Sequence, residues 1–421
     1  MNIRLLIIIS FGAALLSDAI YYLSTAMHIS LDGTYFIGAL KLVSLICLLV
    51  FSVRIKWKMK IPPLVRYFFK WMIVWNVITI IRGGIAAGNY WDWKYLFLNS
   101  SFTMLVPYAL ITGILFTYSK DLLTLMVTRL FVFGYIILPL TLNIDLQREF
   151  YPRAIMITIC FFLLLVPYVK TKWQIAILGV AAASVLLAYD YRANVIRIIL
   201  SLLLVMLYYV RNYISTGLLK FGCLICVLIP PVFLLLGVTG QYNIFKPSDD
   251  VDKYDIEYDN GVTSNLATDT RTFLYEEVFS SMRSNHSFIF GEGATAKYKT
   301  VYFDDEIGQN GGRYGAEVGF LNTLLYSGVI GVFLYALVLF SAIYYGMAAS
   351  NNFFCKMLAI FLAFRWIVLF IEDFVQYDTS NYFLWFAVGL CLSKDFRAMT
   401  DADIREYFNF SPGARTSAQL S

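Results

Sequence analysis

The sequence predicts an all-α membrane protein whose helices carry one large polar loop. Of its 421 residues, 59% are hydrophobic and only 14% are charged, and this balance excludes an ordinary soluble protein of this length. Apolar runs long enough to cross a hydrocarbon core of about 30 Å recur along nearly the whole chain. Only the stretch 239–316 is polar over a long distance. We therefore expect a bundle of membrane-spanning helices with one long loop.

The apolar runs predict about twelve spans. No linker rich in Pro, Gly or Ser and no sequence repeat divides the series, which indicates one integrated domain. The expected spans cover approximately 4–23, 33–53, 65–82, 94–116, 122–142, 153–169, 172–189, 194–210, 217–238, 317–346, 353–371 and 380–393.

The distribution of basic residues predicts the orientation of these spans. Lys and Arg gather in alternate loops, as in the segment 54–60 after the second span, whereas the loops 24–32 and 372–379 are almost free of them. Positive loops stay on the cytoplasmic side. Both termini of the chain should therefore lie in the cytoplasm. Helices 1–9 (1–238) should lead to an external loop (239–316), and helices 10–12 (317–396) should lead back to a cytoplasmic tail (397–421). The basic excess of the chain is a topology signal, and no nucleic-acid partner is expected.

The six cysteines all lie in or beside apolar segments, so they imply no disulfide framework. Cys223 and Cys226 have a C-x-x-C spacing, but they lie in an apolar helix without nearby His or acidic ligands. The acidic residues Asp249, Asp250 and 304–306 are typical of a solvated loop. We expect no metal ion and no other cofactor.

The candidate chemistry lies between Thr268 and Gly331. Arg271, Arg283, Arg313 and Glu317 stand out there, because guanidinium groups with one carboxylate at a membrane surface suit a phosphate-bearing lipid. Ordinary salt bridges in an external loop are the alternative.

The same stretch predicts two local structures. After Arg271, apolar residues recur with the spacing of an amphipathic helix lying on the membrane, and Gly291 and Gly293 suit a tight turn. Glu317 begins the next apolar span, so its carboxylate should lie in the first helical turn, where the helix dipole would also favour it. The apolar residues of the amphipathic pattern are Phe273, Leu274, Val278, Phe279 and Met282.

A short polar break separates two spans on the same external side. It contains Asp190, Arg192 and Asn194, and Arg197 lies about one helical turn beyond Arg192. A charge at this depth needs a partner or water. A tight hairpin turn in which Asp190 pairs with Arg192 explains the break equally well.

These motifs resemble those of the O-antigen polymerase and ligase families of membrane glycosyltransferases. Tyr191–Asn194 is similar to their Ser-Arg-Gly-Asn motif, the segment 270–293 to their loop pattern of an Arg, an amphipathic helix and a Gly-x-Gly turn, and 317–331 to the segment that re-enters the membrane in ligases. Ligases carry His where this chain has Glu317, and Glu at this position looks more like the Wzy-type polymerases.

The resemblance implies a GT-C-like fold in the inner membrane of a bacterium, with the long loop in the periplasm. It implies a polymerase that transfers a growing glycan from undecaprenyl pyrophosphate to a sugar hydroxyl of another lipid-linked repeat unit. Glu317 would be the general base, and Arg192 and Arg271 would bind the pyrophosphate without a metal ion. Other candidates for substrate binding are Asp190, Asn194, Arg197, Arg283 and Arg313.

Membrane lipids, a chain-length regulator and a flippase of the same pathway are the partners that the resemblance implies. Two alternatives stay open: a ligase that transfers finished glycan to the lipid A core, and a polysaccharide transporter or flippase. Transporters commonly contain repeats with a site near the midplane, whereas here the polar groups gather at one face.

Overall fold

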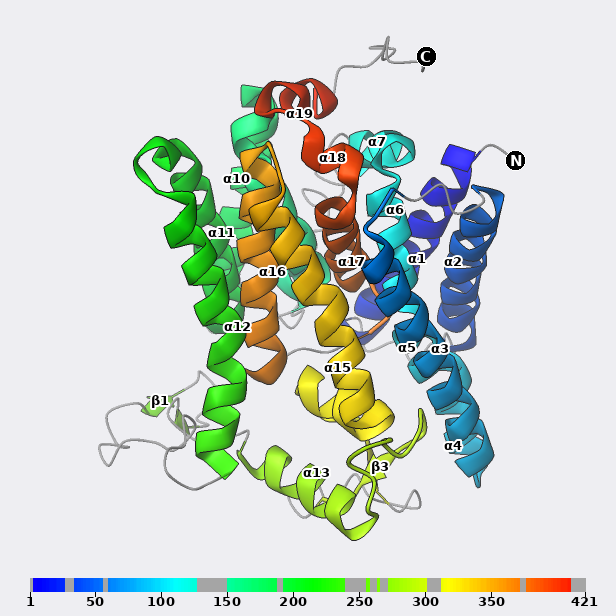
Figure 1. Ribbon diagram of the computed structural model, residues 1–421. Helices are drawn as coiled ribbons and strands as arrows, with labels where there is room; N and C mark the ends of the chain where they lie inside the picture. Colours follow the sequence, from blue (N-terminus) through cyan, green and yellow to red (C-terminus); the bar gives the residue numbers. More distant parts are fainter. Residues whose placement is uncertain are drawn as a thin grey trace.

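The protein folds as a bundle of α-helices with two very small β-sheets at one end (Figure 1). The computed structural model describes residues 3–26, 34–55, 60–126, 150–187, 192–238, 255–257, 263–265, 272–300, 312–371 and 376–409.

In the first half of the chain, all regular secondary structure of the described residues is helical. Its helices are α1 (Ile3–Ala26), α2 (Thr34–Arg54), α3 (Pro63–Ala86), α4 (Tyr90–Tyr95), the π-helix η1 (Leu96–Ser100), α5 (Ser101–Leu105), the 3-10 helix η2 (Val106–Ala109), α6 (Leu110–Ile114), α7 (Phe116–Leu125), α9 (Phe150–Leu164), η4 (Val166–Tyr168), α10 (Thr171–Leu187), α11 (Arg192–Tyr209), η5 (Arg211–Tyr213) and α12 (Thr216–Val238).

The second half contains the strands as well as helices. Its elements are β1 (Asp255–Glu257), β2 (Thr263–Asn265), α13 (Thr272–Ser284), β3 (Lys297–Tyr298), β4 (Arg313–Tyr314), α15 (Gly319–Ala348), α16 (Phe353–Ile371), α17 (Thr379–Leu392), α18 (Lys394–Ala398) and α19 (Asp401–Tyr407). The pairs β1–β2 and β3–β4 are both antiparallel.

Helices occupy every expected span except 122–142, most of which lies outside the described residues. Among the described residues, six helical segments are long and apolar enough to cross a membrane, which identifies the chain as a membrane protein. These segments are Ile3–Tyr21, Tyr35–Arg54, Pro63–Ala86, Tyr90–Ile114, Thr216–Leu236 and Gly319–Ala348.

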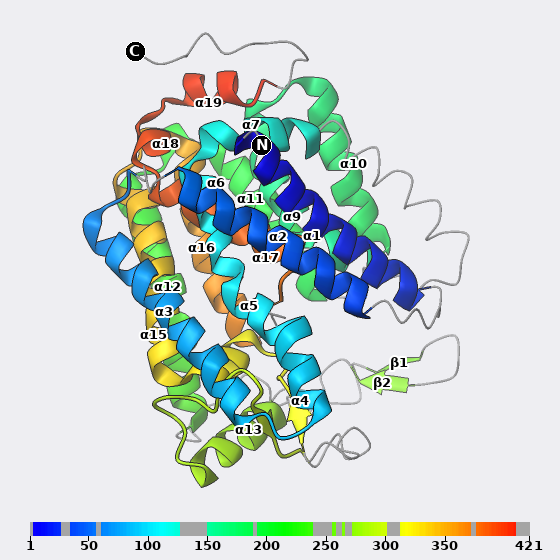
Figure 2. The same ribbon diagram turned by 90° about the vertical axis from the view of Figure 1, so that its right-hand side faces the viewer.

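Helix α17 forms the centre of the bundle (Figures 1 and 2). Every residue from Thr379 to Leu392 is buried, and the helix packs against α1, α6, α9, α15 and α16. At its closest approach to α6, a Cβ at Gly389 would lie 2.0 Å from the carbonyl oxygen of Leu110. Small residues allow two helix backbones to approach this closely where lipid provides no hydrophobic driving force.

The two ends of the bundle are different (Figure 1). The start of α1 lies near α18 and α19 at one end, whereas α4, α13 and β3 lie at the other. Helix α15 begins next to α13 and β3 and runs toward α18, so its first residues lie at the α13 end (Figure 1). The described segments that carry Arg283, Arg313 and Glu317 are thus at the same end of the bundle.

Candidate functional site

Helix α15 is broken at Gly328, at the α13 end of the bundle. Gly328 has φ 66° and ψ −172°, a conformation that only glycine adopts without strain. The break divides α15 into a short first part, 319–327, and a second part, 329–348, of about 30 Å, which is long enough to cross the membrane alone. The family resemblance led us to expect a segment here that re-enters the membrane, and that expectation stays a prediction.

The turn between α13 and β3 satisfies the backbone groups that the break leaves unpaired. The N–H groups of Glu292 and Gly293 donate to the carbonyl oxygens of Leu325 (2.8 Å) and Tyr326 (3.0 Å). In return, Val329 N–H donates to the Phe288 carbonyl oxygen at 2.8 Å. Non-helical backbone at membrane depth persists only where protein groups pair with it, so the turn and the broken helix stabilise each other.

The glycine turn expected from the sequence is present, and its glycines also allow the turn to pack closely against the broken helix α15. Gly291 and Gly293 have φ of 68° and 95°. A Cβ at Gly291 would lie only 2.4 Å from the Tyr326 carbonyl oxygen. Glycine is therefore required at position 291 for its backbone conformation and also for the approach of the turn to the broken helix.

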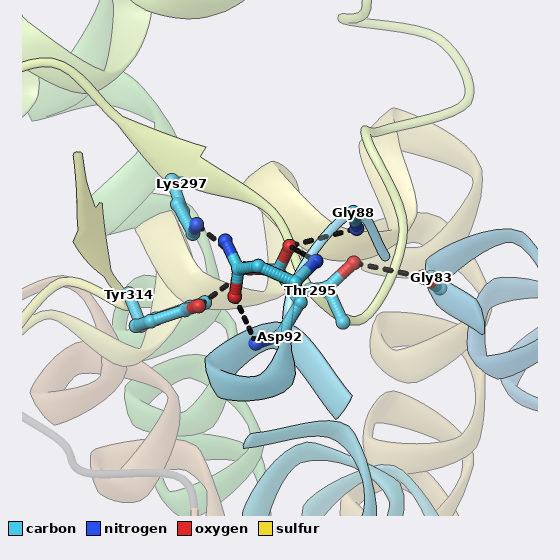
Figure 3. A network of polar contacts seen from close by, with 7 residues as sticks. Gly83, Gly88, Asp92, Thr295, Lys297 and Tyr314 are labelled. Atoms are coloured by element: carbon cyan, nitrogen blue, oxygen red, sulfur yellow. Dashed lines mark hydrogen bonds and ion pairs between the residues drawn. The ribbon is translucent and has the colours of Figure 1, made fainter. Parts of the chain in front are cut away.

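A cluster of polar groups, here called the Asp92 cluster, holds the β3–β4 hairpin against α4 (Figure 3). The Asp92 carboxylate lies 2.7 Å from Lys297 Nζ of β3 and accepts a 2.5 Å hydrogen bond from the Tyr314 hydroxyl of β4. Its other oxygen accepts from the N–H groups of Gly88 (2.9 Å) and Asn89 (3.2 Å), and this second contact completes a capping box at the start of α4. Asp92 thus joins three segments that are distant in the sequence.

Tyrosine side chains extend this contact to the first part of α15. The ring of Tyr95 in α4 stacks on Tyr314, with centroids 4.4 Å apart, and its hydroxyl lies 2.8 Å from the Tyr326 hydroxyl. Burial and the neighbouring Asp92 carboxylate raise the pKa of Tyr314, so this hydroxyl stays protonated and donates to Asp92. The hairpin has a fixed position between α4 and α15.

Arg313 and Glu317, here called the Glu317 pair, follow directly on this hairpin. Arg313 Nη2 lies 3.2 Å from Glu317 Oε1, and Arg313 Nη1 donates to the Tyr298 hydroxyl at 3.3 Å. Of the two side chains, Arg313 exposes 17% of its surface and Glu317 exposes 42%. Among the described residues, only Arg313 hydrogen-bonds to Glu317. The site therefore presents a carboxylate that is fixed at one oxygen and open to solvent.

The expectation that Glu317 lies in the first helical turn is wrong. Helix α15 begins at Gly319, with Val318 as its N-cap, and Glu317 lies before it. The reason is Asn322, whose side chain accepts from the N–H of Ala316 and donates to its carbonyl oxygen. This contact, together with the left-handed backbone of Gly315 (φ 66°), turns the chain away from the helix axis.

The amphipathic helix after Arg271 is confirmed as α13, but its apolar face contacts the protein. Leu274, Val278 and Met282 are at most 1% exposed, and Tyr275 donates from its hydroxyl to the Phe370 carbonyl oxygen of α16 at 2.6 Å. The expectation of a helix whose apolar face is buried in lipid is thus replaced by a helix that covers the end of the bundle.

The structure places the other candidate residues in different parts of the molecule or does not describe them. Arg197 Nη1 donates to Asn194 Oδ1 at 3.2 Å, so these two residues of α11 are together. Arg192 is the first residue of α11. Arg283 is in the last turn of α13 and is exposed. Asp190 and Arg271 lie outside the described residues, as do the acidic residues 249–250 and 304–306.

Sequence reasoning missed the residues that fix the hairpin. Asp92 lies just before an expected span and looks like an ordinary interfacial acid. The one local signal is the spacing of Asn89 and Asp92, which is typical of a capping box, but no local pattern indicates Lys297 or Tyr314 as its partners. In the described part of the chain, no group of three or more His, Cys, Asp or Glu side chains could hold a metal ion.

Comparisons with known protein families, with curated proteins and with solved structures give no match to this chain.

Proposed function

We propose that this protein is a polysaccharide polymerase of the bacterial inner membrane, similar to the O-antigen polymerases. It transfers a growing glycan from undecaprenyl pyrophosphate to a sugar hydroxyl of a second lipid-linked repeat unit. The observation that carries the proposal is Glu317: an open carboxylate, fixed by Arg313, just before the broken helix α15 at one end of a membrane bundle. The sequence motifs that resemble the polymerases are the second support.

In the proposed reaction, the acceptor hydroxyl oxygen attacks the anomeric carbon of the donor glycan. The bond between this carbon and the pyrophosphate oxygen breaks, the hydroxyl proton passes to Glu317, and undecaprenyl pyrophosphate leaves with the electron pair. Arg192 and Arg271 bind the pyrophosphate and neutralise the charge that develops on it. Arg197, Arg283, Arg313, Asp190 and Asn194 contribute to substrate binding, and no metal ion takes part.

The finer architecture belongs to the same proposal: about twelve spans in a GT-C-like fold, cytoplasmic termini and a periplasmic loop. The support is the position of α18 and α19 at one end and of α13 at the other (Figure 1). An impermeant thiol reagent added to intact cells should label Ser284→Cys in α13, but not Lys394→Cys in α18. The opposite labelling would reverse the orientation and place Glu317 on the cytoplasmic side.

The decisive experiment is polymerisation by the purified protein from lipid-linked repeat units in the presence of a chelator. Removal of a general base lowers rates about 10²–10⁴-fold, so Glu317→Gln should nearly abolish elongation and leave binding of the lipid-linked repeat largely intact. The matched control is Glu276→Gln, the same change at an exposed position of α13, which should elongate normally. Arg192→Ala and Arg271→Ala should also produce no polymer.

Each other outcome identifies a different error in the proposal. If the Glu317→Gln variant polymerises at the wild-type rate, Glu317 is not the general base. If chelator abolishes the activity of the wild-type protein, the metal-free mechanism is wrong. A ligase would leave polymer intact but unattached to lipid A core in cells that lack this protein. A transporter would produce no bond between repeat units in the purified assay.

A further inference from the structure

The turn between α13 and β3 exposes large apolar side chains at its tip. Residues 288–291, here called the apolar turn, have the sequence Phe-Ile-Phe-Gly. Ile289 is 59% exposed and Phe290 is 55% exposed. Single exposed apolar residues are common on soluble surfaces, so exposure alone does not identify a partner for this turn.

The backbone of the apolar turn gives a second, independent observation. All four of its carbonyl oxygens accept hydrogen bonds from the protein. Phe288 and Ile289 accept from the N–H groups of Val329 (2.8 Å) and Ile330 (3.3 Å). The carbonyl oxygens of Phe290 and Gly291 accept from Nη1 and Nη2 of Arg82, the latter at 2.6 Å. A turn in water can leave such groups to the solvent, whereas a turn in hydrocarbon needs each one paired within the protein.

The apolar turn also continues a surface formed by two helices that can cross the membrane. Phe290 contacts Trp75 of α3, with ring centroids 6.2 Å apart, and the turn is hydrogen-bonded to the start of the second part of α15. The neighbouring positions of these helices point apolar side chains outward. They are Ile81 (56% exposed) and Ile85 (81%) in α3, and Val329 (53%) and Phe333 (60%) in α15.

We propose that the apolar turn inserts Ile289 and Phe290 into the hydrocarbon of the leaflet on the α13 side. The partner is the lipid acyl chains, since the turn is continuous with the outward-facing apolar surface of α3 and α15 and exposes no unpaired carbonyl oxygen. The long loop is thus anchored in the bilayer between α13 and β3.

The insertion has a consequence for the candidate site. The apolar turn is hydrogen-bonded to the second part of α15, and Glu292 and Gly293, which directly follow the turn, are hydrogen-bonded to the first part. Glu317 precedes the first part of the same helix. Anchoring the turn therefore fixes the depth of the Glu317 pair relative to the lipid headgroups. This consequence adds to the proposed function, but the insertion itself does not depend on it.

The test is spin labelling of single cysteine variants in phosphatidylcholine vesicles, with relaxation by oxygen and by a neutral, water-soluble nickel chelate. Oxygen concentrates in hydrocarbon and the chelate in water. Labels at Ile289→Cys and Phe290→Cys should respond to oxygen and be protected from the chelate, as should Phe333→Cys, the control in α15. Ser284→Cys, exposed in α13, should show the reverse.

The native cysteines are a manageable background, because five are buried and Cys226 is partly buried. The spectrum of the unsubstituted protein, labelled in the same way, is subtracted. Accessibility of positions 289 and 290 to the chelate equal to that of position 284 would place the turn in water and overturn the proposal. Protection from both reagents would also overturn it, because a second copy of the chain or another protein would then cover the turn.

Discussion

The Asp92 cluster and the Glu317 pair lie next to each other on the β3–β4 hairpin, yet their surroundings are different. Asp92 and Lys297 expose 9% and 17% of their side chains, and the carboxylate has four polar contacts. Glu317 is 42% exposed, with Arg313 as its partner among the described residues. A carboxylate whose oxygens are all occupied can hold a structure together, whereas an open one can still exchange a proton with a ligand.

This comparison separates the structural role of Asp92 from the proposed catalytic role of Glu317. It predicts that changes in the Asp92 cluster reduce stability strongly. It also predicts that the change at Glu317 affects the reaction and leaves stability nearly unchanged. The following predictions all concern the free energy of unfolding and run from the largest effect to the smallest.

Asp92→Asn should destabilise the protein most. It removes the negative charge that lies 2.7 Å from the mostly buried Lys297 ammonium, and breaking a buried ion pair costs about 3–5 kcal/mol. Thermal unfolding of the purified protein in detergent measures the loss. The control is Asp395→Asn, which removes an exposed pair with Lys60 (54% and 69% exposed side chains) at the other end of the bundle and should change little. Equal stability of the two variants would contradict a structural role for Asp92.

Tyr314→Phe should have the next largest effect. It keeps the stacking on Tyr95 but removes the hydroxyl that donates to Asp92, and a hydrogen bond to a charged group contributes about 1.5–3 kcal/mol. Tyr213→Phe is the matched control, because Tyr213 is 90% exposed. If both variants unfold at the wild-type temperature, the hydroxyl of Tyr314 is not needed for the cluster.

Gly291→Ala should destabilise the contact between the apolar turn and the broken helix. Position 291 has φ 68°, and a left-handed backbone at a non-glycine residue costs about 1–3 kcal/mol. The new Cβ would also meet the Tyr326 carbonyl oxygen. Gly222→Ala in α12, where a Cβ has no atom within 4 Å, should be neutral or stabilising. A Gly291→Ala protein as stable as wild type would show that the turn can move away from α15.

Glu317→Gln should have the smallest effect on stability. Because the side chain is 42% exposed, solvent screens the pair, and such pairs contribute about 0.2–1 kcal/mol. Chemical unfolding of this variant and of Glu276→Gln should therefore give nearly the same midpoint. A large loss for Glu317→Gln alone would assign Glu317 to the structural group and weaken its proposed role as a base.

Several features of the site follow from local sequence. Gly291 and Gly293 follow the apolar residues Phe288–Phe290 and are two residues apart. Both adopt the left-handed backbone conformation that glycine favours. The apolar spacing after Arg271 predicts α13, but spacing alone does not distinguish a lipid surface from a protein surface as the partner of the apolar face. That choice depends on what else is at the end of the bundle, which is α15 and β3.

The sequence by itself determined the membrane-spanning character and the approximate position of the long apolar helices in the described residues. These properties follow from hydropathy, turn residues and chain direction, which act over a few residues at a time. Tertiary structure alone decided that Asp92 meets a tyrosine 222 positions away. Asp92 and Tyr314 come into contact only when the helices pack, because no local sequence pattern indicates which residues distant in the chain will meet.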